Sequence, residues 1–598
     1  MTMMQPPEAP PLGQGLDRLF APRSIAIVGA SDRPGSFGRR TQVNLSAFEG
    51  ELFLINPKRA AEGGEIDGRR AWASLDALPT APDMVMIATP KDTVQGVVEA
   101  AAAKGAGGAV VFASGFQELG TEEGVAAQRA LAAAARRGGM RLTGPNTIGF
   151  VNFRAGVGAT FLSDLHLDKG FGAPAESRRI GLVSQSGALG LALTQGMMPG
   201  RFFSHCLTMG NSADVDVADC IAFLAQDPDC KAIACNFEGH ADPRRVAAAA
   251  KLASDAGKAL VVYKMATGEA GATAAASHTG NLAGSHEAYR TMFEHSGAVM
   301  VDHYEALLET ADFFARATPN KGEGMAVVAT SGGAAIMAAD AAEKHKVPLP
   351  LPDAALTERL EARIPDFGAA TNPCDVTAQV INDMESLIDC AEGFLERDDY
   401  GALMMPHLFA YESSFARIPV MDELGGRHRK LIMTVWMSSW LEGPGLSELL
   451  EKPNTAVFHS LDRCFETYAA WRRWLKRGAL TAEAGPVAPA GAMAAAEAAL
   501  SAAPGPVLAE RDAKPVFAAY GVDAIGEASV DSASAARAAA EAAGFPVVLK
   551  LDAPDLAHKT EVGGVELGLA VGEAVAAAFE TMMAKAAAAG VTPRGALV

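Results

Sequence analysis

Short runs of apolar, often β-branched residues alternate with alanine-rich helical patterns along most of this chain, and this alternation constrains its fold most strongly. The first series is "SIAIV", "LFLIN", "MVMIA", "GAVVFA" and "RLTG", within residues 24–144. A second, within 180–264, is "IGLVS", "FFSHCL", "AIACNF" and "ALVVYK". A third, within 325–436, is "MAVVAT", "ALMMP" and "LIMTVW". Strands separated by helices pair in parallel, so the pattern predicts an α/β fold with several doubly wound parallel sheets.

The C-terminal part of the chain follows a different pattern. Residues 479–505 are rich in Ala, Pro and Gly around one short helical pattern, which is typical of a linker. Beyond it come a helix, "FPVVLKL", "GGVELGL", another helix and a final strand pattern, "PRGALV". We therefore expect domains over residues 14–152, 178–316, 322–478 and 506–598, and we expect the last of them to be incomplete.

Composition excludes several classes of protein. The net charge is -19, whereas nucleic-acid binding depends on clustered Lys and Arg. No apolar run reaches transmembrane length, and the N-terminus lacks the basic and apolar regions of a signal peptide. The seven cysteines are scattered, as in reduced proteins. These features predict a cytoplasmic protein with neither nucleic acid nor membrane as a partner.

A glycine turn follows the first predicted strand in "IAIVGASDRPGSFG", where backbone N–H groups and a helix start can bind phosphate. Its glycines do not fit GxGxxG, and the second strand ends at "INPK" rather than at the acid expected for NAD. Lys58 attracts an additional phosphate, which favours coenzyme A over NAD. Taken alone, a solvated surface lysine is equally compatible with this position, and an NAD-dependent dehydrogenase is the disfavoured alternative.

Two segments share a strand, a Ser-Gly step and a helix. They are "GLVSQSGALG", with Ser186 and Gly187, and "AVVATSGGAAI", with Ser331, Gly332 and Gly333. Each directs free N–H groups and the positive end of a helix toward an anion, and two such starts facing each other would clamp one phosphoryl group. For either segment alone, the alternative to phosphate binding is that glycine only allows the helix to pack closely on the strand.

His278 lies in a stretch of small residues, "AAASHTGNLAGS", which we expect to be a mobile loop. Neutral imidazole is a competent nucleophile toward phosphorus at pH 7. Glu238, after the strand in "CNFEGH", can orient the ring and stabilise the cation that forms on phosphorylation. Lys264 is either an additional positive charge near the phosphate or a solvated lysine.

The strand ends of the first series resemble a known family. "VGAS", "NPK", "IATP", "SGFQELG" and "GPNTIG" are similar, in this order, to the CoA-binding domain of the ADP-forming acyl-CoA synthetases, which are related to succinyl-CoA synthetase. The resemblance implies a Rossmann-like CoA-binding domain, with Thr147 where the family commonly has Cys. It implies that coenzyme A is bound by Gly29, Ser31, Lys58, Thr89, Pro90 and Asn146.

The later motifs resemble the same family. "ASHTGNLAGS" is similar to its phosphohistidine loop and "NFEG" to the segment with the supporting glutamate, which implies that His278 is phosphorylated and that Glu238 is its partner. The two Ser-Gly helix starts then form a phosphate cradle in two flavodoxin-like domains. "GNSADVDVADC" and "TNPCDVT" also resemble family stretches, with no chemistry assigned to Asp216 or Asp375.

The last unit resembles the first subdomain of an ATP-grasp domain, in "LAERDAKPVFAAYGV" and "GFPVVLKLDAPDLAHKTEVGGVELGL". This implies nucleotide binding by Lys550, Gly563 and Gly564, and a second phosphohistidine at His558. In the family a later part of this domain supplies the Mg²⁺ ligands, so the metal ligands here are unknown.

Together these features predict an acid–CoA ligase. It would form an acyl-CoA from a carboxylic acid, coenzyme A and ATP with Mg²⁺, and release ADP and phosphate through a phosphohistidine and an acyl phosphate. The resemblance also implies a homo-oligomer. Phe409, Tyr411 and Trp436 are candidates to line the acyl pocket, although aromatic residues in such runs are more often core. The alternative is a CoA-binding regulatory protein without turnover.

Overall fold

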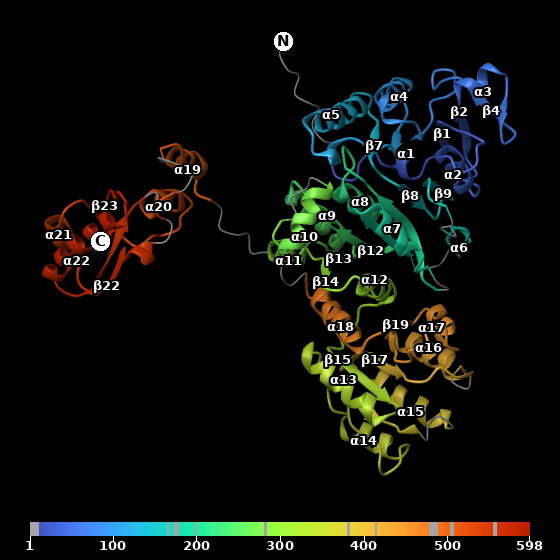
Figure 1. Ribbon diagram of the computed structural model, residues 1–598. Coiled ribbons are helices and arrows are strands. Elements are labelled where there is room, and N and C mark those ends of the chain that lie inside the picture. Colours follow the sequence, from blue (N-terminus) through green and yellow to red (C-terminus); the bar gives the residue numbers. More distant parts are fainter. Residues whose placement is uncertain are drawn as a thin grey trace. The chain divides into compact units, whose positions relative to one another are not determined.

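The computed structural model describes residues 11–163, 165, 167–172, 179–197, 200–279, 284–378, 383–412, 415–477, 488–502, 508–553, 556 and 559–598. It divides into two compact units, Met1–Ala479 and Leu480–Val598. The first unit contains three sheets with helices packed on them, and the second contains one (Figure 1). The predicted α/β class with several parallel sheets is confirmed.

The first sheet has the order β3-β4-β2-β1-β5-β6-β7 and is parallel except at β3. Its order reverses at β1, which pairs with β2 on one side and β5 on the other, and such a reversal opens a crevice at the carboxyl ends of the strands. The strands are β1 (Ser24–Val28), β2 (Glu51–Ile55), β3 (Glu65–Ile66), β4 (Arg69–Trp72), β5 (Met84–Ile87), β6 (Gly108–Val111) and β7 (Arg141–Thr143). The helices are α1 (Asp17–Phe20), α2 (Phe37–Asn44), α3 (Pro57–Ala61), α4 (Lys91–Lys104), η1 (Gln117–Leu119) and α5 (Glu122–Arg137).

The second sheet has the order β14-β13-β12-β10-β11-β8-β9. The β8–β9 hairpin follows the first sheet in the chain but pairs antiparallel with β11, so the two sheets are joined directly. The strands are β8 (Gly149–Asn152), β9 (Val157–Thr160), β10 (Arg179–Ser184), β11 (Phe202–Thr208), β12 (Cys230–Phe237), β13 (Ala259–Lys264) and β14 (Val299–Val301). The helices are α6 (Asp168–Phe171), α7 (Gly187–Thr194), α8 (Val217–Gln226), α9 (Pro243–Asp255), α10 (Glu269–Thr279), α11 (His286–His295) and α12 (Ala306–Arg316).

The third sheet is parallel throughout, in the order β16-β15-β17-β18-β19. Its edge strands β16 and β19 were not predicted, whereas the three central strands were. The strands are β15 (Gly324–Ala329), β16 (Cys374–Asp375), β17 (Tyr400–His407), β18 (Ile432–Trp436) and β19 (Thr455–Phe458). The helices are α13 (Gly332–Lys344), α14 (Ala354–Glu361), α15 (Met384–Leu395), α16 (Arg417–His428), α17 (Leu446–Glu451) and α18 (Leu461–Leu475).

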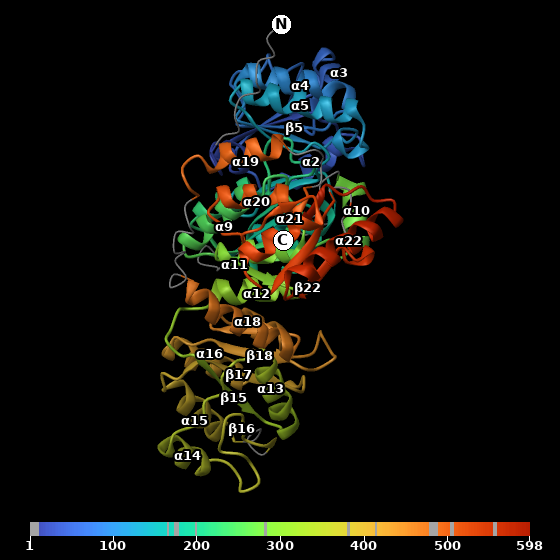
Figure 2. The ribbon, with the colours of Figure 1, turned by 90° about the vertical axis from the view of Figure 1, so that its left-hand side faces the viewer.

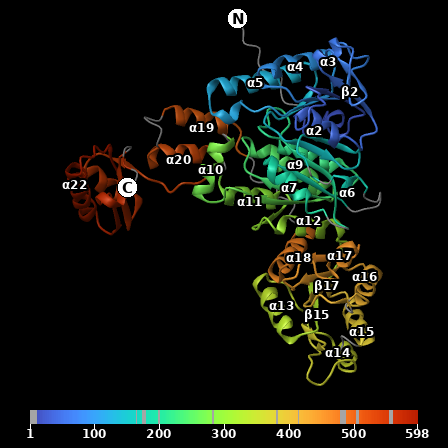
Figure 3. The same cartoon turned by 45° about the vertical axis from the view of Figure 1, so that its right-hand side comes forward.

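Helix α12 joins the second and third sheets. Every residue of this helix is buried, and it packs on β12 and β13 on one side and on β19 and α18 on the other. Figures 2 and 3 show it between the two sheets. Its charged side chains are paired, since Glu309 contacts His459 Nδ1 at 2.7 Å and Asp312 contacts Arg316 at 3.0 Å. One apolar cluster therefore spans both sheets.

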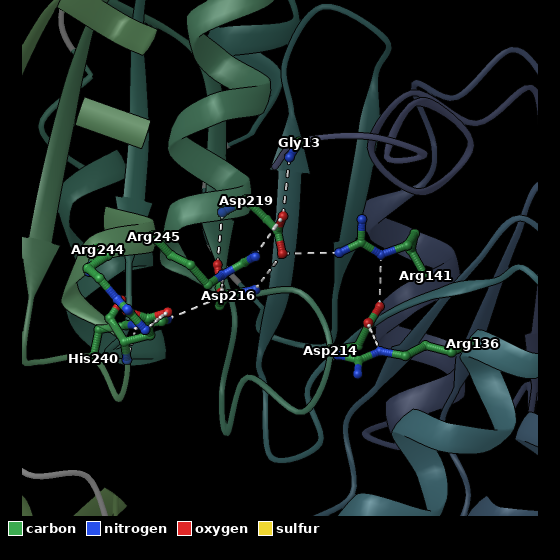
Figure 4. A network of polar contacts seen from close by, with 10 residues as sticks. Gly13, Arg136, Arg141, Asp214, Asp216, Asp219, His240, Arg244 and Arg245 are labelled. Carbon is green, nitrogen blue, oxygen red and sulfur yellow. Dashed lines mark hydrogen bonds and ion pairs between the residues drawn. The ribbon is translucent and has the colours of Figure 1, made fainter. Parts of the chain in front are cut away.

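A buried ion network joins the first and second sheets (Figure 4). Arg141 of β7 donates from Nε to Asp214 at 2.9 Å and from Nη2 to Asp219 at 3.0 Å. Arg136 also pairs with Asp214, and Arg245 with Asp219. Burial alone would lower the pKa of Arg141, but the two carboxylates raise it. Asp214 lies three residues before α8 and Asp219 lies in its first turn, so this helix is anchored to the first sheet.

The second unit has an antiparallel sheet in the order β20-β23-β21-β22, packed against α21 and α22. The final strand pattern was predicted correctly, because β23 pairs with β21 and β20. The predicted linker contains the expected short helix, α19. The strands are β20 (Ser529–Val530), β21 (Val547–Asp552), β22 (Val565–Leu569) and β23 (Gly595–Leu597), and the helices are α19 (Ala492–Ser501), α20 (Glu510–Ala519), α21 (Ala533–Ala543), η5 (Lys559–Val562) and α22 (Gly572–Ala588).

Within the part of the chain that the structure describes, no helix combines the length and the apolar character needed to span a membrane.

Candidate functional site

The six residues predicted to bind coenzyme A all follow carboxyl ends of first-sheet strands. Gly29 follows β1 with φ +91°, and a Cβ there would lie 2.7 Å from the carbonyl oxygen of Ala88, so only glycine fits this close approach. The same added Cβ would lie 3.0 Å from the Thr89 side chain, which follows β5. Ser31 and Pro90 lie in the turns after β1 and β5, and Lys58 is exposed in the first turn of α3, after β2. These residues therefore gather at the carboxyl edge of the first sheet, with the exposed Lys58 among them.

Asn146 and Thr147 connect this crevice to the second sheet. Asn146, with φ +58°, donates from Nδ2 to Asn211 at 3.2 Å. The buried Thr147 hydroxyl lies 3.1 Å from both the carbonyl and hydroxyl oxygens of Thr208, and accepts from the N–H of Gly149 at 3.1 Å. Thr147 is therefore held by hydrogen bonds across the junction between the two sheets.

The carboxyl edge of the second sheet brings Ser186 and Glu238 together through a residue that sequence reasoning missed. Gln185, between β10 and the start of α7, accepts from the N–H of Glu238 at 2.7 Å and donates to the carbonyl of Gly239 at 2.8 Å. Ser186 is the N-cap of α7, and its side chain makes no capping hydrogen bond. The first N–H groups of α7 are thus left without a side-chain cap beside the buried Glu238.

Lys264 is a buried residue of this site, and the solvated alternative is wrong. Its side chain is 2 % exposed, and its Nζ donates to the Glu238 carbonyl at 2.7 Å. Burial lowers its pKa to about 8, although the Glu238 carboxylate acts in the opposite direction. Lys264 and Gln185 therefore hold the backbone of Glu238 from two sides.

His278 lies in the last turn of α10, and its side chain is outside the described part of the structure. The predicted loop over residues 274–285 is wrong for its first half, which is helical. This stretch is helical because alanine is the strongest helix former and Glu269 suits the first turn. α10 contacts η1, so the helix that carries His278 reaches the elements of the first sheet.

The second predicted helix start lies on the third sheet. Ser331 is the N-cap of α13 and, like Ser186, makes no capping hydrogen bond. A Cβ at Gly332 would lie 2.9 Å from Asp375 Oδ2, so this glycine allows the carboxylate to approach the helix start, and Gly333 is exposed next to it. α7 packs on β10 and β11, and α13 on β15, β16 and α18. The clamp between the two starts stays a prediction.

A cavity of about 700 Å³ lies between α13 and the carboxyl ends of β18 and β19. Trp436, at the end of β18, is 2% exposed in an apolar cluster, borders this cavity, and stacks on His407 with ring centroids 4.7 Å apart; its role in an acyl pocket stays a prediction. Phe409 and Tyr411 are not among its lining residues, and Phe409 is 63 % exposed. The lining includes Met337, Trp436, Met437, Leu441, His459 and Asp462.

In the second unit the predicted nucleotide residues lie around β21. Lys550 is in this strand, and its Nζ pairs with Glu510 at 2.8 Å. Gly563, with φ +66°, and Gly564 form the turn before β22, and Gly564 pairs with Leu551 through its carbonyl. His558 lies outside the described residues. Among the described residues of the whole chain, no group of three or more His, Cys, Asp or Glu side chains is placed to hold a metal ion.

Three family models match the chain. They are a CoA binding domain over residues 23–152, a succinyl-CoA ligase like flavodoxin domain over 177–314 and an ATP-grasp domain over 499–598. The matched regions contain the first-sheet crevice, the edge with Ser186 and Glu238, and β21.

Relatives and solved structures agree with these matches. A trans-feruloyl-CoA synthase from an unknown prokaryotic organism is 31% identical over 95% of this chain and 78% of its own length. An ADP-forming acetate–CoA ligase I from Archaeoglobus fulgidus is 31% identical over 95% of this chain and 80% of its own. A dinucleotide forming acetyl-coenzyme A synthetase 1 from Ca. Korarchaeum cryptofilum, in complex with phosphate and ADP, has a TM-score of 0.68 at 27% identity, covering 78% of this chain and 99% of that one. With this similarity over nearly its whole length, the chain belongs to the ADP-forming acyl-CoA synthetases and is an acid–CoA ligase that uses coenzyme A and adenine nucleotide.

Proposed function

We propose that this ligase works through a phosphohistidine at His278 and an acyl phosphate. The γ-phosphoryl group of ATP passes to a ring nitrogen of His278, and ADP leaves. A carboxylate oxygen of the acid then attacks phosphorus, which breaks the P–N bond and forms the acyl phosphate. The thiol of coenzyme A, losing its proton, attacks the acyl carbon and expels phosphate. A carboxylate is a poor electrophile, so the first two steps supply it with a leaving group.

The observation that carries this proposal is the arrangement at the carboxyl edge of the second sheet. Gln185 and Lys264 hold the buried Glu238 next to the side-chain-uncapped start of α7. We assign Glu238 as the partner that orients and stabilises the phosphorylated ring. We assign Ser186 and Gly187, with Ser331, Gly332 and Gly333, as the phosphate cradle. Several further points stay predictions. They are nucleotide binding by Lys550, Gly563 and Gly564, a role for His558, the use of Mg²⁺, the homo-oligomer, the domain boundaries and the cytoplasmic location.

Coenzyme A is proposed to bind along the crevice of the first sheet. The lack of a side chain at Gly29 lets the turn after β1 lie against the Ala88 carbonyl at the end of β5, and exposed Lys58 supplies a positive charge for a phosphate. Thr89, Pro90, Ser31 and Asn146 complete the rim of the crevice.

We further propose that the acid is larger than acetate. The cavity beside α13 has a volume of about 700 Å³ and includes Met337 and Trp436 in its lining, which suits an aromatic acyl group. One relative is named a trans-feruloyl-CoA synthase, whose acyl group is a substituted aromatic acid.

A variant that fills this cavity tests the acyl assignment. Ser438 lines the cavity from the loop after β18, so Ser438→Trp is expected to lower turnover of ferulate by at least about ten-fold and to spare acetate. Glu442→Trp adds the same ring in the same loop at an exposed residue outside the lining and should spare both acids. An equal effect of Ser438→Trp on both acids would contradict the assignment.

A further inference from the structure

His240 lies two residues after Glu238, in the turn between β12 and α9, and both nitrogens of its ring have partners. The N–H of Asp242 donates to Nδ1 at 2.9 Å, and Nε2 lies 3.1 Å from Asp216 Oδ2. A carboxylate only accepts hydrogen bonds, so Nε2 carries the proton that bonds to Asp216. Nδ1 also lies 2.8 Å from the Asp242 carbonyl, which accepts a second proton when the ring is charged. The ring therefore has partners in either state.

The backbone of His240 is held as well. Its N–H donates to the Tyr289 hydroxyl at 3.0 Å, and that hydroxyl donates to the His240 carbonyl at 3.1 Å. Tyr289 is 5 % exposed and packs edge-to-face on Phe237, the last residue of β12, at 4.9 Å. One tyrosine of α11 thus fixes both the end of the strand and the residue that follows Gly239.

Asp216 is a firm anchor for the ring. It is the N-cap of α8 in a capping box with Asp219, and it also accepts from Arg245 at 3.1 Å. Asp219 in turn forms an ion pair with Arg141 of the first sheet (Figure 4). Burial raises the pKa of Asp216, but its bonds to His240 and its neighbours lower it to about 2, and the same pairing raises the pKa of His240. The anchor therefore stays charged at neutral pH.

These contacts place one support on each side of Gly239. Upstream, Gln185 and Lys264 hold the backbone of Glu238, and downstream, Asp216 and Tyr289 hold His240. Gln185 also accepts from the N–H of Gly239 at 3.3 Å and donates to its carbonyl at 2.8 Å, so the backbone from Glu238 to His240 is held continuously.

We propose that His240, held by Asp216 and Tyr289, is a positioning residue that fixes the orientation of Glu238 for phosphoryl transfer at His278. This rests on the proposed role of Glu238. His240 itself touches neither phosphate nor substrate in this proposal and acts only through Glu238.

The test measures phosphorylation of the full chain from acyl-CoA and labelled inorganic phosphate, alongside CoA affinity by calorimetry. Tyr289→Phe keeps the ring packing and removes only the hydroxyl, and His240→Ala removes the imidazole. Each is expected to slow labelling by about ten- to a hundred-fold, as misplacement of a catalytic group does, with CoA affinity unchanged. His240→Gln, whose amide N–H can still reach Asp216, should recover most of the rate. Arg244→Ala, in the first turn of α9 with its side chain 92% exposed, is the matched control and should label normally.

The double variant Glu238→Gln/His240→Ala decides between positioning and a separate effect. If His240 acts through Glu238, the double variant is no slower than Glu238→Gln alone, whereas independent effects multiply. Two results would overturn the inference and leave the proposed function standing. One is that the effects of the two substitutions multiply. The other is normal labelling in both His240→Ala and Tyr289→Phe while Glu238→Gln is slow. Normal labelling in Glu238→Gln would overturn the proposed role of Glu238, and the inference with it.

Discussion

Replacing Arg141 with methionine should weaken the junction between the first and second sheets. The Arg141 side chain is 5% exposed and makes charged hydrogen bonds to Asp214 and Asp219 at 2.9 and 3.0 Å. Removing one partner of a buried ion pair costs about 3–5 kcal/mol. Asp214 keeps Arg136 and Asp219 keeps Arg245, so neither carboxylate is left without a cation. We therefore expect a loss near the lower end of the range, about 3 kcal/mol in the free energy of unfolding.

Hydrogen exchange at increasing urea concentration, read by mass spectrometry, measures this loss, because peptides of the first and second sheets are resolved from those of the third. The matched control is Arg154→Met, because Arg154 pairs with Asp229 at the same 2.9 Å but with side chains 36% and 38% exposed. An exposed pair contributes about 0–1 kcal/mol, so the control should shift the midpoint little. Equal losses in Arg141→Met and Arg154→Met would refute the claim that burial makes this network important.

Three smaller perturbations test the site residues. Burial lowers the pKa of Lys264 from 10.5 to about 8, so the folded protein binds fewer protons than the unfolded chain between these values. The free energy of unfolding of the wild-type protein, relative to that of Lys264→Met, should therefore rise from pH 8 to 10.5 by at most about 3 kcal/mol. A difference between the two proteins that does not change with pH would contradict the burial of Lys264. Thr147→Val removes a buried hydroxyl with partners in β11 and should cost about 1–3 kcal/mol by thermal unfolding, whereas Thr147→Ser should cost less. Gly29→Ala should weaken CoA binding, measured by calorimetry, more than Gly35→Ala does. Both glycines have positive φ, but only the Cβ added at Gly29 meets a neighbour, the Ala88 carbonyl. Equal weakening by the two variants would argue against CoA binding in the crevice.

The positions of site residues at strand ends were predictable from the sequence. Gly29, Ser186 and Glu238 each follow a buried apolar run, and parallel strands bring such ends to one edge of a sheet. The family resemblance added roles to these positions, and the structure places Glu238 beside Ser186 through Gln185.

The contacts that support these residues were not predictable. Gln185, Asp216, His240 and Tyr289 come together only after four separate segments have folded together, and nothing in the local pattern of any one of them indicates the others. Lys264 shows the same limit, since a lysine at the end of a strand is expected to be solvated until its burial is known. The helix at residues 274–279 was mispredicted from small size alone, where alanine content was the better guide.

The most direct measurement is the fate of labelled phosphate on the intact chain supplied with an acyl-CoA, since this direction uses the proposed acyl, CoA and histidine sites without ATP. Feruloyl-CoA and acetyl-CoA serve as probes, and a parallel reaction uses γ-labelled ATP with Mg²⁺. We predict a base-stable, acid-labile label that is absent in His278→Ala and transferable to ADP. Normal labelling of His278→Ala, or acyl-CoA formation at the wild-type rate by that variant, would contradict a phosphohistidine at this residue.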